Sequence, residues 1–370
     1  MLRSAIRLSP HFLRQLGGRS AAPLRVACAS HPAIIPPQHL PVPRRLTTAA
    51  KTDPAAPAVA PLIPFRTHPS TSPSTPTAHT FYHTSDGTWT YLVVSPSSSS
   101  CVIIDPTLDF SPSTFTISAS AADGLLAFIE QEGLKVERIL ETHAHADHLT
   151  AAAYLQSKLP SYAPIGASTG MRQTQAHFGR VFDVPQEELE VAFDEMYEDG
   201  QEIVLGAGEG GKGGLKGRVL HLPGHTACSA AYVFGEYVFV GDTIFLPTLG
   251  SARADFPAGS AHSLYTSSQR LLSLPPSTRL FSGHHYPSSP SENVCSATVK
   301  EHREKNKHLH EGVGEEEFVR MREERDKGLK EPGLLWQSLQ VNIRAGRLPR
   351  SATTGEVYLR MPVKGAPDGI

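Results

Sequence analysis

The sequence predicts a mixed α/β fold, and three patterns support this prediction. Short apolar runs of strand length alternate along the chain with stretches in which apolar residues recur at helical spacing. Clusters of glycine, proline and serine separate these segments and indicate turns. Several apolar runs end directly in histidine or aspartate. We therefore expect strands and helices to alternate, with polar side chains presented at the strand ends.

The densest group of polar side chains is the segment from Glu141 to Thr150, Glu-Thr-His-Ala-His-Ala-Asp-His-Leu-Thr. It follows the apolar run 136–140, which we expect to be a buried strand, and precedes a helical pattern over 149–158. His143 and His145 alternate at the strand end and point to one side, and the aspartate and histidine that follow can turn back toward them. Neutral imidazole and carboxylate are the usual ligands of zinc and non-haem iron. This segment is therefore predicted to be a metal-binding loop.

Length and composition exclude several protein classes. The chain has 370 residues, of which 39% are hydrophobic, so it has room for one large or two modest domains. Its four cysteines, Cys28, Cys101, Cys228 and Cys295, lie far apart without a CxxC pair, which argues against a disulfide framework and for a reducing compartment. No segment approaches the roughly 18 uninterrupted apolar residues of a membrane span.

The first 52 residues differ from the rest in charge. They contain eight Lys and Arg and no acid, with apolar residues set among arginines over 1–20. This composition is typical of a mitochondrial transit peptide, with 44–48 as a plausible processing region, so we expect a mitochondrial matrix protein; a disordered basic tail is the alternative. Subtracting those eight from the 34 basic residues of the chain leaves 26 basic and 36 acidic residues in the rest of the chain. This acidic balance argues against nucleic-acid binding.

Residues 53–79 are rich in Pro, Ala, Ser and Thr, and we expect a disordered linker there, with structure beginning near Thr80. The strands expected next are 81–85, 88–94 and 101–104, followed by a helix over 121–132. Asp105 ends the third of these strands. It either turns its carboxylate toward the metal loop or caps a turn.

The segments after the metal loop continue the alternation. A helix at 149–158, a strand at 163–166 and a helix at 170–180 are expected in turn. The glycine-rich stretch Gly206 to Gly214 lacks the GK[ST] ending of a phosphate-binding loop, so we expect a flexible hairpin connection there. Cys228 is expected to be a small core residue.

Three further apolar runs deliver candidate ligands. One reaches His225 through a Pro-Gly turn, one stops at Asp242, and one ends at His284. The seven potential ligands are His143, His145, Asp147, His148, His225, Asp242 and His284. They can hold two metals bridged by Asp242, or one metal on two histidines and a carboxylate, which leaves half an octahedron open as Fe(II) requires. The ligand inventory leaves both arrangements open.

Other histidines are not expected to bind metal. His302, His308 and His310 lie in a charged helical stretch, 299–311, and are predicted to face solvent. His285 follows a candidate ligand directly and should point away from the site if the segment is extended.

The motif order HxHxDH, GHT, GDT and GHxY, spread over residues 88–290, resembles the metallo-β-lactamase superfamily. The resemblance implies an αββα sandwich, in which two mixed β-sheets lie face to face with helices outside and the metal at one edge. It also implies a domain over 80–290, with 291–370 forming a C-terminal helical extension and a substrate-site segment packed on that domain.

Segments such as Gly250 to Pro257 and Gln340 to Pro349 are similar to the persulfide dioxygenase branch of this superfamily, especially its bacterial β-lactamase-like hydrolase group. That resemblance implies one Fe(II) per chain, held by His143, His225 and Asp242, and oxidation of glutathione persulfide with O2 to sulfite and glutathione. His145, Asp147, His148 and His284 would be metal ligands only if a second metal binds. The branch usually has Asp where this chain has His285, and a homodimer is possible.

A glutathione pocket needs guanidinium groups for two carboxylates and a carboxylate for the amine. Arg253, Arg344 and Asp255 are the candidates, together with Asn342 beside the second arginine. The alternatives are a structural ion pair between Arg253 and Asp255, and a purely structural role for Asn342 and Arg344. Tyr286 would place its hydroxyl near the open face of the metal, and it and Asp147 are the expected catalytic residues.

Two other functions remain open from the sequence. The first is a binuclear thioester hydrolase resembling glyoxalase II, commonly with a Zn(II) pair. The second is a non-catalytic member that binds thiols or scaffolds a partner, although all seven ligand positions are filled.

Overall fold

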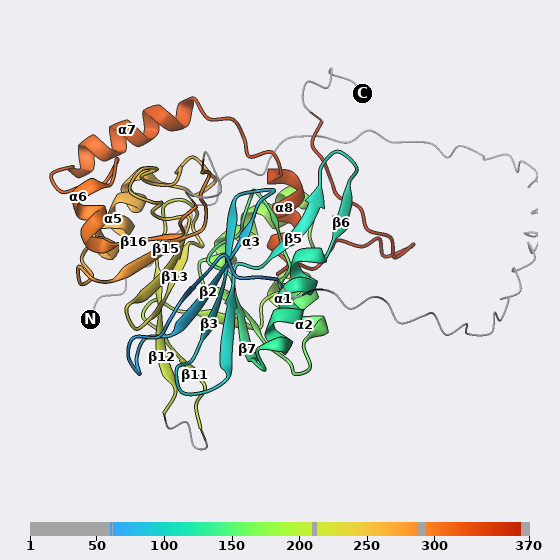
Figure 1. Cartoon of the computed structure of the whole chain (residues 1–370). Helices are drawn as coiled ribbons and strands as arrows, with labels where there is room; N and C mark the ends of the chain where they lie inside the picture. Colours follow the sequence, from blue (N-terminus) through green and yellow to red (C-terminus); the bar gives the residue numbers. More distant parts are fainter. Residues whose placement is uncertain (1–59, 61, 209–212, 288–292, 364–370) are drawn as a thin grey trace, which may run out of the picture. The chain divides into compact units, whose positions relative to one another are not determined.

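The computed structural model describes residues 60, 62–208, 213–287 and 293–363 (Figure 1). The chain divides into residues 1–56 and 57–370, and all described residues belong to the second unit. The expected transit peptide, the cysteine at position 28 and the first residues of the expected linker lie outside the described residues. Within the second unit, two large β-sheets carry helices on their outer faces (Figure 1).

The first sheet is mixed and has seven strands in the order β1-β2-β3-β4-β7-β9-β10. The strands are β1 (Arg66–His68), β2 (Thr77–His83), β3 (Thr88–Val94), β4 (Ser100–Ile104), β7 (Lys135–Leu140), β9 (Ile165–Ser168) and β10 (Glu195–Tyr197). The first four pair antiparallel, and from β4 to β10 the pairing is parallel. Every residue of β3 is buried, as expected for a β-branched and aromatic strand covered on both faces.

The second sheet has six strands in the order β11-β12-β13-β14-β15-β16. The strands are β11 (Glu202–Leu205), β12 (Leu215–His221), β13 (Ala230–Phe234), β14 (Tyr237–Gly241), β15 (Arg279–Ser282) and β16 (Ser296–Thr298). Only β14 and β15 among them pair parallel. A small sheet joins β6 (Thr116–Ser118), β5 (Thr107–Ser111) and β8 (Leu149–Thr150).

Aromatic side chains fill the space between the two large sheets. Tyr91 of β3 meets Phe239 of β14 with 5.0 Å between ring centroids, and Phe239 stacks on Phe281 of β15 at 4.9 Å. All three rings are buried, and the Tyr91 hydroxyl donates to the carbonyl oxygen of Ser282. Large rings dominate the free energy of a buried layer. This layer therefore fixes the two sheets face to face and sets the ends of β7, β14 and β15 relative to one another.

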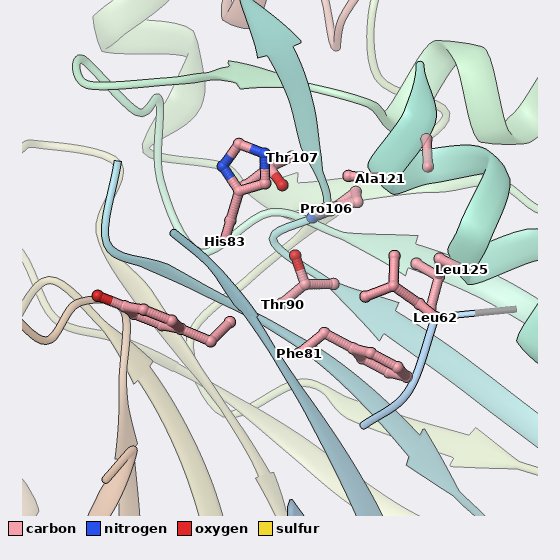
Figure 2. Close-up of a pocket in the computed structure, with 10 residues that line it drawn as sticks. Leu62, Phe81, His83, Thr90, Pro106, Thr107, Ala121 and Leu125 are labelled. Carbon is pink, nitrogen blue, oxygen red and sulfur yellow. The ribbon is translucent and has the colours of Figure 1, made fainter. Parts of the chain in front are cut away.

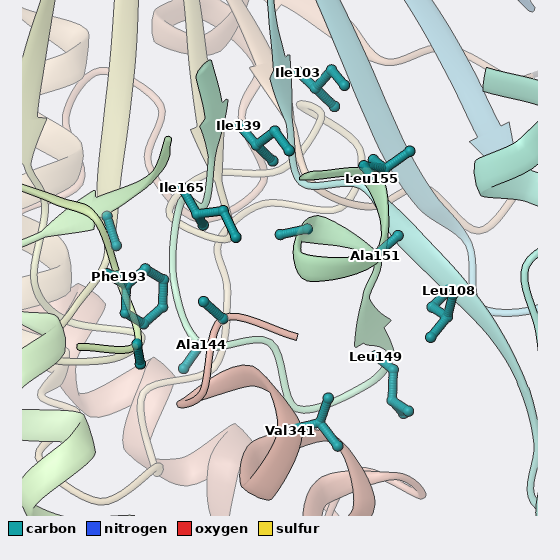
Figure 3. Packing of buried hydrophobic residues seen from close by; sticks show 14 of the residues in the cluster. Ile103, Leu108, Ile139, Ala144, Leu149, Ala151, Leu155, Ile165, Phe193 and Val341 are labelled. Carbon is teal, nitrogen blue, oxygen red and sulfur yellow. The ribbon is translucent and has the colours of Figure 1, made fainter. Parts of the chain in front are cut away.

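Helices cover the outer face of each sheet. The first sheet carries α1 (Ser120–Gln131), α2 (Ala152–Lys158), α3 (Met171–Phe182), α4 (Gln186–Glu190) and α8 (Leu335–Asn342). The second sheet carries α5 (Ala261–Leu272), α6 (Val299–Lys305) and α7 (Glu315–Lys327). Figure 3 shows the first helix layer, where Ile103, Ile139 and Ile165 of three neighbouring strands pack with Leu155 of α2 and Val341 of α8. The predicted αββα sandwich is confirmed.

Two of the predicted boundaries are wrong. Ordered structure begins before Thr80, because β1 pairs with β2 as an edge strand and Phe65 packs edge-on against Trp89 at 5.4 Å. The helix predicted from residue 149 begins at Ala152, because the two residues of β8 pair with β5. The hairpin predicted at the glycine-rich stretch is confirmed by the antiparallel pairing of β11 with β12 on either side of it.

The prediction that His302 and His308 face solvent is also wrong. Their exposed fractions are 1% and 5%; His302 lies on the face of α6 that packs on the second sheet, and His308 follows that helix. His310 is exposed as expected. The Nδ1 atom of His308 accepts a hydrogen bond from the Ser251 N–H at 3.0 Å, and that of His302 lies 3.1 Å from Asn306 Nδ2. Burial lowers the pKa of both histidines to about 4, so both are neutral at physiological pH.

Candidate metal centre

The loop 141–148 after β7 is held against the second sheet by backbone contacts. The Ala230 N–H donates to the carbonyl oxygen of Thr142 at 2.8 Å, and the Tyr232 hydroxyl donates to that of Glu141 at 2.8 Å. Both donors belong to β13, and Thr142 precedes the first histidine of the loop directly. The loop of one sheet is therefore anchored beside the strand ends of the other.

Two glycines allow the close approach of the strand ends. Gly241 ends β14 with φ +49°, and a Cβ atom there would lie 2.3 Å from Thr142 Oγ1. Gly283 follows β15, and a Cβ atom there would lie 2.4 Å from Asp242 Oδ1. Any larger residue at these positions would displace the metal loop or the aspartate.

His143, His225 and Asp242 form the first candidate metal group. One ligand atom from each lies within 4.8 Å of the others, and all three residues are buried. His143 Nε2 and Asp242 Oδ1 are buried and have no hydrogen-bond partner among the described residues. Leaving a buried polar atom unpaired costs roughly 1–3 kcal/mol. A bound cation would remove that cost, so these three residues fit a metal.

The hydrogen bonds and protonation of the two imidazoles also suit a metal. His225 Nδ1 donates to the carbonyl oxygen of Arg253 at 2.8 Å, which leaves Nε2 facing Asp242, 3.9 Å from Oδ2. Burial lowers the pKa of His225 and lowers that of His143 well below its usual value. Both rings are therefore neutral at physiological pH and have a lone pair to donate.

The other four predicted ligands lie beside this group. His145, Asp147 and His148 form a second cluster whose ligand atoms are within 4.8 Å of one another. His284 Nε2 lies 3.2 Å from Asp147 Oδ2 and 3.5 Å from Asp242 Oδ2, so Asp242 is positioned between the two clusters. His145 Nδ1 and His148 Nε2 are buried without a partner among the described residues. All seven predicted ligands are thus brought together.

Asp105 and Glu141 orient His145. The His145 Nε2 atom lies 3.1 Å from Asp105 Oδ1 and 3.3 Å from Glu141 Oε2, so Nδ1 is turned toward the candidate site. Asp105 also accepts hydrogen bonds from the N–H and the hydroxyl of Thr142, both at 2.8 Å. Burial lowers the pKa of His145, but the two carboxylates raise it well above its usual value. The interpretation of Asp105 as a carboxylate turned to the metal loop is confirmed; the similar role of Glu141 was missed, although it stands four residues before His145.

Asn342 supports the metal loop and does not line the substrate cavity. Its Nδ2 donates to the carbonyl oxygens of His145 and His148, both at 2.8 Å, and its Oδ1 accepts from the Thr150 N–H at 2.9 Å. Arg344 is buried and donates to Glu188 and to the backbone of α8, away from the cavity lining. The expectation that these two residues bind substrate is corrected in favour of the structural alternative, because α8 packs against β8 behind the metal loop.

A cavity of about 640 Å³ opens onto the candidate centre. Asp147, His225, Asp242 and His284 lie along it. Tyr286 also lines the cavity and is exposed, with its ring stacked on that of His284 at 5.8 Å and an interplanar angle of 4°. The structure therefore places the Tyr286 ring beside His284, and its catalytic role stays a prediction.

Arg253 lines this cavity, but its guanidinium is already occupied. Its Nε and Nη2 atoms donate to the two carboxylate oxygens of Asp255, both at 2.6 Å, and Nη1 donates to the carbonyl oxygen of Lys330 at 2.8 Å. Asp255 is not part of the cavity lining. Phe256 packs under the arginine and edge-on against the His225 ring at 5.0 Å. The ion pair expected as the alternative is present, and it braces the loop beside the metal ligands.

The remaining predicted neighbours of the site behave as expected. Cys228 is fully buried, and its sulfur accepts the Ala144 N–H at 3.2 Å, which braces the metal loop from the core side. His285 turns away from the centre, with its Nδ1 atom 2.9 Å from Asn293 Oδ1.

None of the helices in the described parts of the chain is long and apolar enough to cross a bilayer.

A separate hollow lies between β2 and α1, far smaller than the cavity at the metal ligands (Figure 2). Its volume of about 30 Å³ leaves room for a few water molecules at most, and Leu62, Phe81 and Leu125 line it with His83. His83 is already paired, with Nδ1 2.6 Å from Asp86 and Nε2 2.8 Å from Asp109. This hollow is too small for a substrate.

Comparison with known proteins identifies the domain. A family model described as the metallo-beta-lactamase superfamily matches residues 83–284. The chain is 41% identical over 290 residues to the beta-lactamase hydrolase-like protein of Xylella fastidiosa, covering 78% of this chain and 65% of that protein. It is 37% identical over 277 residues to glyoxylase B2 of Dictyostelium discoideum, covering 74% and 91%. It is 27% identical over 262 residues to the mitochondrial persulfide dioxygenase ETHE1 of Bos taurus, covering 70% and 84%.

A solved structure gives a similar result. The crystal structure of ETHE1 from Myxococcus xanthus superposes with a TM-score of 0.57 at 25% identity, covering 73% of this chain and 99% of that one. The chain spans about two thirds of the length of the Xylella relative and nearly the whole of the Myxococcus chain. The matched region contains every predicted metal ligand.

Proposed function

The chain belongs to the metallo-beta-lactamase superfamily, and we propose that it is a mononuclear iron persulfide dioxygenase that oxidises glutathione persulfide with dioxygen. The observation that carries this proposal is the convergence of His143, His225 and Asp242 within 4.8 Å at the cavity. Two imidazoles and one carboxylate on one face are the ligand set of non-haem Fe(II) oxygenases. Iron bound there would supply the redox chemistry and open positions for sulfur and dioxygen.

The overall reaction is balanced by one water molecule. Glutathione persulfide, dioxygen and water give glutathione, sulfite and two protons. The terminal sulfur is oxidised, dioxygen is reduced, and the sulfur–sulfur bond breaks so that glutathione leaves as the thiol. The chain must therefore hold the persulfide with its terminal sulfur toward the ligand group and limit the access of other water.

The cavity residues are arranged for that task. Phe256 covers His225, and Phe245 lies near His284 with 6.3 Å between ring centroids, so apolar rings border the ligand group. Asp147 Oδ2 contacts His284 Nε2 at 3.2 Å and His148 Nδ1 at 3.3 Å. In a mononuclear centre this carboxylate holds the protons of both imidazoles, and the Tyr286 hydroxyl of the cavity lining orients the incoming thiol.

The similarity to the bovine persulfide dioxygenase ETHE1 and to the ETHE1 structure from Myxococcus xanthus supports this reaction. One observation favours a second candidate. His145, Asp147 and His148 form a second possible metal group, and His284 lies beside it. Two metals bridged by Asp242 would give a thioester hydrolase resembling glyoxalase II, commonly with zinc. The similarity to glyoxylase B2 of Dictyostelium, at 37% identity, supports this second candidate.

One experiment separates the two candidates. The protein is purified anaerobically, its metals are counted, and the same sample is given fresh glutathione persulfide in an oxygen electrode and S-lactoylglutathione in a hydrolysis assay. The proposal expects about one iron per chain, oxygen uptake with sulfite release, and little thioester cleavage. Two metals per chain with rapid thioester cleavage and no oxygen uptake would refute it in favour of the hydrolase.

Two statements about the whole protein are also proposals. Residues 1–52, which lie outside the described residues, would direct the chain to the mitochondrial matrix. Attaching them to a fluorescent protein and imaging cells tests this, with diffuse fluorescence as the contrary result. A homodimer is the second proposal, and light scattering of the full chain measures its mass.

A further inference from the structure

We propose that Arg325, on α7, binds a carboxylate of the thiol substrate and sets the preference of the cavity for acidic thiols of the glutathione kind. The inference rests on the proposed function, since it assumes that the thiol enters the cavity at the metal ligands. It assigns a role in specificity to one residue of the C-terminal segment 291–370.

Three arginines line the cavity, and two of them are neutralised. Arg253 forms the double hydrogen bond with Asp255 described above. Arg322 is buried and donates from Nε and Nη2 to Asp326 Oδ1, at 3.0 and 2.6 Å. Its Nη1 donates to the carbonyl oxygen of Ser251 at 3.3 Å. Because their guanidinium groups are already paired with a carboxylate, Arg253 braces the loop and Arg322 braces the helix. Few of their donor groups remain free to bind a ligand.

Arg325 differs from both. Its guanidinium makes no hydrogen bond or ion pair with any residue in the described parts of the chain, yet it lines the cavity from the solvent-accessible side of α7. The ion pair between Arg322 and Asp326 fixes this turn of α7, so the backbone at Arg325 is held beside the cavity.

The charge balance of the cavity determines what Arg325 attracts. The pairs at Arg253 and Arg322 are neutral overall, and the carboxylates of Asp147 and Asp242 belong to the metal centre. Among the described residues that line the cavity, the guanidinium of Arg325 is therefore the arginine charge left without a carboxylate partner. A guanidinium fork binds a carboxylate with two parallel hydrogen bonds, whereas it repels an amine. Glutathione carries two carboxylates, so its thiol can lie at the metal while an acid group reaches the helix.

The test measures binding without turnover. S-methylglutathione and its diethyl ester, in which both carboxylates are blocked, are titrated by calorimetry into the metal-loaded full chain and into the variants Arg325→Gln, Arg325→Lys and Arg320→Gln. Arg320 is the matched control, because it is exposed on the same helix but does not line the cavity. Since neither ligand can be oxidised or hydrolysed at a thioester, the result does not depend on which reaction the site performs.

We expect the wild-type chain to bind the acid about tenfold or more tightly than the ester, the usual strength of a hydrogen bond to a charged group. In Arg325→Gln, the affinity for the acid should fall by a similar factor and the affinity for the ester should stay unchanged. Arg325→Lys should retain part of the preference for the acid, and Arg320→Gln should retain all of it. Unchanged discrimination in Arg325→Gln, or an equal loss in Arg320→Gln, overturns the assignment. Absence of binding to the wild-type chain overturns the substrate class itself, whereas the expected binding pattern without oxygen uptake refutes only the proposed reaction.

Discussion

Asn342 is predicted to hold the metal loop in its binding conformation, and the variant Asn342→Ala tests this. The substitution removes hydrogen bonds to the backbone of His145, His148 and Thr150, all buried. At about 1 kcal/mol for each of the three, the free energy of unfolding should fall by about 3 kcal/mol. For a domain of this size that loss corresponds to a drop of roughly 5 °C in Tm. Because the loop carries four of the ligands, metal affinity should fall by roughly 10–100-fold as well.

The assay combines thermal unfolding with metal competition against a chelator, on Asn342→Ala and two companions. Asn342→Asp keeps the volume but turns a carboxylate oxygen toward two carbonyl oxygens, so it should lose at least as much metal affinity as the alanine variant. Ser338→Ala is the control, since this buried hydroxyl on the same helix has no partner among the described residues. A metal affinity in Asn342→Ala equal to that of the control would refute the reasoning.

Three further predictions follow from single residues. Asp242→Asn should lower metal affinity by more than the roughly 10–100-fold typical of residues that only orient ligands, as measured by metal content after dialysis; a full complement of metal would contradict its role. Burial lowers the pKa of His83, but Asp86 and Asp109 raise it to about 9, above its unfolded value of 6.5. The stability from His83 is therefore full below pH 6.5 and lost as the pH rises through 9, so denaturant unfolding of His83→Gln should differ from wild type at pH 6 and converge with it by pH 10. Burial lowers the pKa of His308 to about 4, so its folded form resists protonation and wild-type stability should fall as the pH drops from 6.5 to 4. That slope should be shallower in His308→Gln, and an identical slope would argue against burial of the ring.

The sequence by itself determined the candidate ligands and their placement near strand ends. His143, His225, Asp242 and His284 each follow an apolar run closely, and this relation is local, so it can be recognised without the fold. The alternation of strands and helices also followed from local periodicity, and the sandwich was implied by the order of the motifs. The transit-peptide prediction also rests on a local property, the excess of basic residues among the first 52.

Only the tertiary structure decided which other side chains meet the site. Asn342 reaches the metal loop from almost 200 residues away, and Arg344, next but one to it, turns to Glu188 instead. The contrast depends on how α8 packs, which no spacing in the sequence encodes. His302 and His308 looked like solvent-facing residues of a charged helix, yet both are buried: His302 lies on the packed face of α6, and His308 contacts Ser251.

The arginines show the same division most clearly. In the sequence, Arg253, Arg322 and Arg325 are equivalent cations, and nothing local distinguishes a paired guanidinium from a free one. The structure separates them because a carboxylate lies within hydrogen-bonding distance of the first two, and none among the described residues does so for Arg325. Residue type and local pattern fix which atoms can bind a metal, whereas long-range packing fixes which charges remain available for a substrate.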